Sequence, residues 1–95
     1  MDFELEGPVV EWRGPAPFYF VDLPGEDSED IKVAAQGVEY WGQVPVVVRL
    51  GEVEFTTALF PKDGRYLLPL KDAVRRPAGL VVGQIVSVGL RVGRR

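Results

Sequence analysis

The feature that most constrains this chain is the close spacing of its glycine and proline turn signals. They separate short valine-rich and aromatic runs, and they lie at Gly7-Pro8, Gly14-Pro15, Pro24-Gly25, Gly51, residues 61–64, Gly79 and Gly83. Turn signals at such short intervals leave room only for short elements, and this pattern is typical of strands in a barrel or a sandwich. The 95 residues are enough for one small domain with its own core. We expect a single β-barrel domain over residues 1–92 and a flexible tail at 93–95.

The runs between the turns predict six strands. These cover residues 3–12, 17–23, 43–50, 52–60, 65–68 and 84–92. The first run is interrupted by Gly7-Pro8, and proline cannot donate to a central ladder, so we expect an edge strand with a bulge or bend there. Residues 61–64 read Pro-Lys-Asp-Gly, which predicts a type I turn closing a hairpin.

Two short helices are predicted between the strands. The first begins with Asp27 or Ser28 as its N-cap, and its apolar positions recur at helical spacing, at Ile31, Ala34, Ala35 and Val38. The second runs from about Leu70 to Arg76 and is expected to end near Pro77 and Gly79. Acids at the start of the first helix and arginines at the end of the second both suit the helix dipole.

The order strand, strand, helix, strand occurs twice in this prediction. Residues 18–24, a helix and residues 43–50 parallel residues 65–69, a helix and residues 84–90. The leading strands of the two units are residues 3–5 and 55–59. This pattern indicates an internal repeat of one supersecondary unit.

Charge is distributed unevenly between the two halves. Residues 1–50 carry three basic and ten acidic side chains, a net charge of −7, and residues 51–95 carry eight and four, a net charge of +4. Such asymmetry can mark an anionic partner for the basic half. The simpler expectation is that the halves pack together and largely neutralise each other.

The residue types that are missing exclude several kinds of chemistry. The chain has no cysteine and no histidine, which excludes zinc sites built on them, thiol nucleophiles and imidazole-dependent triads. It also lacks a phosphate-cradling glycine motif and a calcium-loop pattern. We therefore expect a protein that is not an enzyme and needs no cofactor. Acids at the start, and no apolar run of roughly 20 residues, predict a soluble cytoplasmic protein without membrane contact.

Two family resemblances follow from the motifs. Residues 64–88 resemble the swapped-hairpin pattern of the AbrB, SpoVT and MazE group: a Gly-Arg strand, a proline, a short basic helix, Gly-Leu, and a glycine turn into a valine strand. Residues 3–92 more closely resemble the bacterial domain of unknown function 1905 family. The segments that carry this likeness are Phe3-x-Leu5, residues 20–24, Arg49-Leu50-Gly51, residues 55–59 and residues 64–88.

The resemblance implies a double-split β-barrel, an AbrB-like pseudo-dimer in which one chain supplies both halves. It also implies a monomer or a weak homodimer. Two residues depart from the pattern: Gln84 stands where aspartate is usual, and Pro77 stands where a residue that continues the helix is commoner.

Two functions remain open. The AbrB-like resemblance implies a nucleic-acid-binding regulator or antitoxin-like protein, with Arg65, Arg75 and Arg76 facing the phosphates. The equivalent part of the first half, residues 22–30, is acidic and would repel a phosphate backbone. The leading expectation is therefore a binding or interaction module for a protein or a small ligand.

The aromatic residues bear on that second function. They gather in the first half, at Trp12, Phe18, Tyr19, Phe20, Tyr40 and Trp41. Adjacent strand residues point to opposite faces, so these side chains cannot all share one core. Either an exposed group of them forms a recognition groove, or Trp12, Phe18, Phe20 and Trp41 fill the barrel while Tyr19 and Tyr40 cover its outside. The second arrangement is the simpler expectation.

Overall fold

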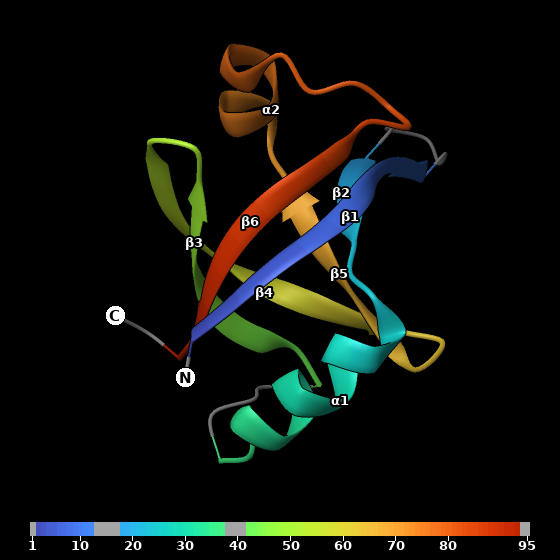
Figure 1. Cartoon of the computed structure of the whole chain (residues 1–95), viewed down its shortest axis with the longest axis vertical. Coiled ribbons are helices and arrows are strands. Elements are labelled where there is room, and N and C mark those ends of the chain that lie inside the picture. The colour runs from blue at the N-terminus through green and yellow to red at the C-terminus, as the bar shows by residue number, and fades with distance from the viewer. Residues whose placement is uncertain (1, 13–17, 38–41, 94–95) are drawn as a thin grey trace.

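Six antiparallel strands close into a barrel, and one helix lies at each end of it (Figure 1). The computed structural model describes residues 2–12, 18–37 and 42–93. Their elements in chain order are β1 (Asp2–Trp12), β2 (Phe18–Asp22), α1 (Gly25–Ala34), β3 (Val44–Leu50), β4 (Val53–Lys62), β5 (Arg65–Leu70), α2 (Asp72–Ala78) and β6 (Ile85–Val92). Around the barrel the strands follow the order β1-β2-β5-β4-β3-β6. The predicted small β-barrel with two short helices is confirmed.

The barrel consists of two units with the same order of elements, strand, strand, helix, strand. Exchanging β1 with β4, β2 with β5 and β3 with β6 leaves every pair of neighbours in the barrel unchanged. Phe3 lies opposite Leu90 on β6, and Phe55 lies opposite Val48 on β3. Leu90 and Val48 in turn lie opposite each other. The predicted repeat is therefore confirmed, and one chain supplies both halves of a barrel with approximate twofold symmetry.

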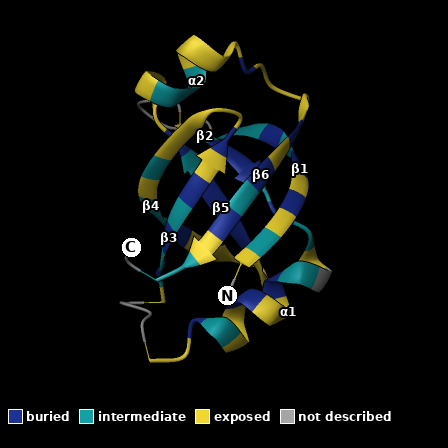
Figure 2. Cartoon of the chain, turned by 60° about the vertical axis from the view of Figure 1, so that its left-hand side comes forward, coloured by how far each residue is buried: buried dark blue, intermediate teal, exposed yellow. Residues whose placement is uncertain are grey.

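Buried and exposed residues alternate along strands of the barrel (Figure 2), and the buried ones fill its interior. Successive residues of a strand point to opposite faces, and in the equivalent strands β3 and β6 every second residue is buried. β3 contributes four such residues, Val44, Val46, Val48 and Leu50, and β6 contributes three, Val86, Val88 and Leu90. Branched side chains of this kind fit a pleated surface well.

β1 is not the edge strand that its proline predicts. Residues 2–8 pair with β6, and residues 9–12 pair with β2. The proline is accommodated because Pro8 stands just before the ladder to β2 begins at Val9, so no bond of that ladder needs its missing N–H. At Gly7-Pro8 the pairing of β1 therefore changes from β6 to β2, its two neighbours in the barrel.

Gly7 faces inward at this change of partner. A Cβ atom at Gly7 would overlap the backbone carbonyl oxygen of Asp22 and lie 3.2 Å from a methyl group of Val21. Backbone atoms cannot yield as a flexible side chain can. Close approach of β1 and β2 therefore requires glycine at this position.

α1 begins earlier than predicted. It starts at Gly25, its N-cap is Pro24, and the hydroxyl of Ser28 donates to the carbonyl of Pro24 at 3.0 Å from within the first turn. Neither Asp27 nor Ser28 is therefore the N-cap. Proline can enter the helix here because its ring fixes a compatible φ. Ile31 and Ala35 are fully buried, as their spacing predicts, and the helix packs against β5.

α2 lies two residues further along the chain than predicted. Leu70 belongs to β5 and is buried, and the helix continues through Pro77 to Ala78. Pro77 falls in the last turn, where the helix is about to end. The carbonyls of Arg75 and Arg76 accept from the N–H groups of Leu80 and Gly79, which forms a Schellman-type end.

The hairpin between β4 and β5 closes through a different turn from the predicted type I. Lys62 pairs with Arg65, so the loop has only the two residues Asp63 and Gly64, both with positive φ (52° and 78°). Positive φ at both central residues defines the type I′ turn, whose twist matches that of paired strands. Pro61 accordingly lies within β4.

Parts of the sequence predictions fall on residues 13–17, 38–41 and 94–95, outside the described residues. They include the Gly14-Pro15 turn, the last apolar position of the first helix at Val38, and most of the expected tail.

Replacement of Gly7 by alanine is predicted to destabilise the barrel by about 3 kcal/mol, since the methyl group meets backbone that cannot move aside. The matched control is Gly25→Ala, because a Cβ there meets only the side chain of Arg65, at 3.6 Å. We expect that change to alter the free energy of unfolding by less than about 1 kcal/mol. Urea unfolding followed by circular dichroism measures both. Equal stability of the two variants would contradict the close approach at Gly7.

Candidate ligand-binding groove

The outer surface of β1, β2, β5 and β4 carries a group of apolar side chains. Trp12 lies opposite Phe18, Phe20 lies opposite Pro69, and Phe60 lies opposite Leu67. Their immediate neighbours along the strands, such as Val21, Leu59 and Leu68, are buried in the barrel core. Strand alternation therefore directs the first group outward.

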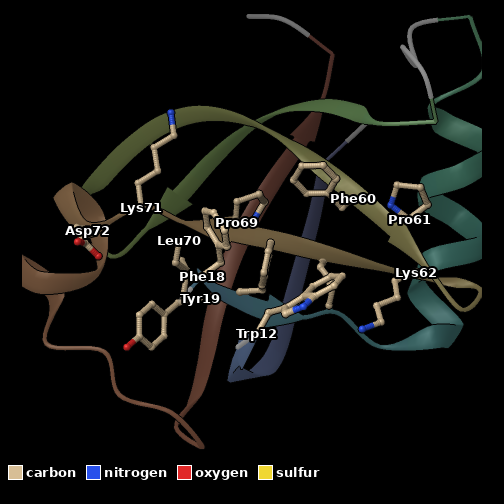
Figure 3. A pocket seen from close by; sticks show the side chains of 12 residues that line it. Trp12, Phe18, Tyr19, Phe60, Pro61, Lys62, Pro69, Leu70, Lys71 and Asp72 are labelled. Carbon is tan, nitrogen blue, oxygen red and sulfur yellow. The ribbon is translucent and has the colours of Figure 1, made fainter. Parts of the chain in front are cut away.

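These side chains line a recess, which we call the aromatic groove (Figure 3). Its volume is about 880 Å³, within the usual range for small-molecule sites. The floor is formed by Phe20 and Leu67, only 8% and 7% exposed. The walls stand in solvent, with Trp12 52%, Phe18 60% and Phe60 40% exposed.

Ring contacts hold the groove in shape. Phe20 lies between two other rings: its centroid is 6.4 Å from that of Trp12, in a tilted arrangement, and 6.3 Å from that of Phe60, in an edge-to-face one. Such geometries are the favourable ones for aromatic pairs. All three side chains come from strands of a closed barrel, so the groove exists before any ligand enters.

The simpler expectation for the aromatics is wrong. Trp12, Phe18 and Phe20 were expected to fill the barrel, but they lie outside its core cluster and line the groove. Tyr19 was expected to cover the outside; it is half-buried, packs against the core and also lines the groove. The reason is the phase of β2, in which Tyr19 shares a face with Val21. Tyr40 and Trp41 lie outside the described residues.

The sequence held a signal for this arrangement. Val21 and Leu23 are apolar residues in phase with Tyr19, and Phe18 and Phe20 are in phase with each other. A strand with apolar side chains on both faces must direct one set out of the barrel. Only the pairing partners decide which set that is.

Two lysines border the aromatic groove. The ammonium nitrogen of Lys62 lies 4.2 Å from the centre of the Trp12 ring, close enough for a cation–π interaction. Lys71 lies toward the other end (Figure 3). The carboxylate of Asp72, which also lines the groove, lies 3.1 Å from Arg75 and 3.7 Å from Arg76. Within the described part of the chain, neither lysine forms an ion pair.

The three arginines expected to bind nucleic acid do not gather on one surface. Arg65 begins β5 and lies 3.3 Å from the carboxylate of Asp22, whereas Arg75 and Arg76 belong to α2, beyond the other end of β5. Both α2 arginines contact Asp72, and the guanidinium of Arg75 also lies 4.0 Å from the Tyr19 ring centre. Each of the three arginines therefore lies beside an acidic side chain.

Another part of the outer surface is charged. Around β1, β3 and β6 it carries the ion pairs Glu4–Arg49 at 3.1 Å and Asp2–Arg91 at 3.3 Å. Asp2–Arg91 and Asp22–Arg65 each join an acid of the first half to a base of the second. These pairs agree with the expected neutralisation between halves. Exposed pairs of this type contribute little to stability.

In residues 2–12, 18–37 and 42–93, no three acidic, histidine or cysteine side chains come together as metal ligands would. Neither helix of the described chain has the length and apolar character needed to span a bilayer.

The fold and the groove define a class of protein: a six-stranded barrel made of two β-β-α-β units in one chain, with an aromatic recess on its outer surface. The model of the family described as Domain of unknown function (DUF1905) matches residues 6–90. The chain belongs to this family. A comparison with curated proteins found no match. The AbrB-like resemblance of residues 64–88 stays a prediction.

Exposure of Trp12 can be measured directly. In a Trp41→Phe variant Trp12 is the only tryptophan, and we expect acrylamide to quench it at about half the rate seen for the same variant in urea, as its 52% exposure implies. Circular dichroism confirms that the variant is folded. A tryptophan that acrylamide barely quenches in the folded state would show that the groove wall is covered.

Duplex binding is expected to be absent because the three arginines are paired and separated. In a low-salt anisotropy titration with random duplex DNA, we predict no signal at protein concentrations well above about 10 µM, the middle of the usual non-specific range. Binding that weakens when Arg75 and Arg76 are both changed to glutamate would restore the nucleic-acid hypothesis.

Proposed function

We propose that this protein is a non-enzymatic binding module that takes a small apolar ligand in the aromatic groove. The observation that carries this proposal is the exposure of Trp12, Phe18 and Phe60 around a buried floor. Exposed aromatic rings gain free energy when a ligand removes them from water, at roughly 25 cal/mol for each Å² of apolar area. Rings gathered around one recess therefore favour binding there.

The shape of the groove supports a small ligand. Phe20 and Leu67 lie below the surrounding rings, so a ligand on this floor is in contact from beneath and from the sides. The ring contacts of Phe20 keep Trp12 and Phe60 in place. A site formed in advance loses little entropy on binding, which improves affinity for a given contact area.

The side chains in the groove favour binding over catalysis. Acid–base catalysis needs a titratable group that is free to exchange a proton with the substrate. Among the described lining residues, Asp72 is the one carboxylate, and two arginines hold it. The lining also contains the titratable side chains of Tyr19, Lys62 and Lys71, but the floor of the groove, formed by Phe20 and Leu67, carries no titratable group.

The proposal is tested with N-phenylnaphthylamine, an uncharged probe that fluoresces in apolar sites. We expect wild-type protein to bind it, and Trp12→Ala and Phe60→Ala each to raise the Kd about tenfold, which corresponds to about 1.4 kcal/mol. Each change removes a groove wall that lies largely in solvent, so the fold should persist.

Val53→Ala is the matched control, since Val53 is an exposed apolar residue that does not line the groove. It should leave the Kd unchanged, and thermal melts should show all variants folded. A probe that binds wild type and both groove variants equally would place the site elsewhere. A loss of affinity in Val53→Ala as large as in the groove variants would also place the site elsewhere.

A further inference from the structure

We infer that the ligand of the aromatic groove is amphipathic, with a planar apolar body and an anionic group that contacts Lys62. This inference rests on the proposed function and adds the charge of the ligand. It follows from the position of Lys62 and from the pairing of the nearby acid.

Lys62 lies at the end of β4, where it pairs with Arg65 beside the hairpin turn. Its ammonium nitrogen lies 4.2 Å from the centre of the Trp12 ring. That contact holds the positive charge against the wall of the groove, although the side chain is otherwise exposed. A ligand stacked on the rings would therefore meet a cation at its edge (Figure 3).

The negative charge nearest the groove is already compensated. Oδ1 of Asp72 lies 3.1 Å from Nη2 of Arg75, and Oδ2 lies 3.7 Å from Nη2 of Arg76. Lys62 and Lys71 have no such carboxylate partner in the described part of the chain. Among the described residues that line the groove, the uncompensated charge is therefore positive, which favours an anion and disfavours a cation.

The two lysines do not form one anion site. Lys62 precedes β5, Lys71 follows it, and the six residues of β5 lie between them. At about 3.3 Å per residue, the strand separates them by roughly 20 Å. A compact anion contacts one lysine only, and Lys62 is the one beside the Trp12, Phe20 and Phe60 rings.

The number of cations also bears on the size of the ligand. Non-specific binding of a nucleic-acid backbone depends on neutralising several phosphates, and the two lysines of the described lining supply too few positive charges for it. A recess of about 880 Å³ suits a single small molecule. The groove therefore fits a free amphipathic anion, such as an aromatic carboxylate.

Two probes of similar shape separate charge from apolar contact. Anilinonaphthalene sulfonate carries one negative charge, and N-phenylnaphthylamine carries none. We expect Lys62→Gln to weaken sulfonate binding about threefold to fivefold, the range of an exposed ion pair, and to leave the uncharged probe unchanged. Raising NaCl from about 50 mM to about 500 mM should reproduce this difference in the wild type, because salt screens the ion pair.

Matched lysine variants control for a general charge effect. Lys71→Gln should have a smaller effect than Lys62→Gln, and Lys32→Gln, at an exposed position of α1, should have none. Equal weakening of both probes by Lys62→Gln would mean that the lysine acts through packing and would overturn the inference. Unchanged sulfonate binding would also overturn it.

Other outcomes separate this inference from the proposed function. If neither probe binds wild type, the proposed function fails and the inference fails with it. If the uncharged probe binds the wild type, but the sulfonate binds the wild type no better than it binds Lys62→Gln, only the inference fails. Light scattering at the probe concentrations supplies a further check: a dimer that Trp12→Ala dissociates would show that a second copy, and not a small anion, occupies the groove.

Discussion

The pairing of β2 with β5 is the constraint on which the groove depends. It aligns Tyr19 with Leu70, Phe20 with Pro69 and Val21 with Leu68, and it joins the two halves of the chain. A shift by one residue would exchange the faces of every side chain on the strand. Tyr19 would then lose its contact with the core, and Phe20 would turn toward the barrel interior. The observed register is favoured because Val21, Leu23 and Leu68 fill the barrel without any exposed area.

Much of the fold could be predicted from local sequence, because turns and periodicity are local properties. The strand positions, the inward face of α1 and the twofold repeat all followed from them. Helix ends and the type of the turn at Asp63-Gly64 were local errors, whereas the two larger errors each involve a partner distant in sequence. Pro8 looked like an edge residue because its ladder to β2 was unknown, and Phe20 looked like a core residue because hydrophobicity does not distinguish the two faces of a strand.

The candidate site was predictable only as a set of alternatives. The sequence placed an excess of aromatics in the first half, but the groove also needs Phe60, Leu67 and Pro69 from the second. The basic residues showed the opposite error. Arg65, Arg75 and Arg76 share a motif in sequence. In the fold, Arg65 lies at one end of β5, Arg75 and Arg76 lie beyond the other end, and each arginine lies beside an acid. Charge read along a chain overstates the charge that a folded surface presents.

The approximate twofold axis passes between β2 and β5, so the groove lies across it, with β1 on one side and β4 on the other. Two identical chains around such an axis would present the same residues on both sides. A single chain has no such obligation, and here Trp12 and Phe18 face Phe60 and Pro61. The site therefore has distinguishable ends, and a ligand without symmetry can be held in one orientation only.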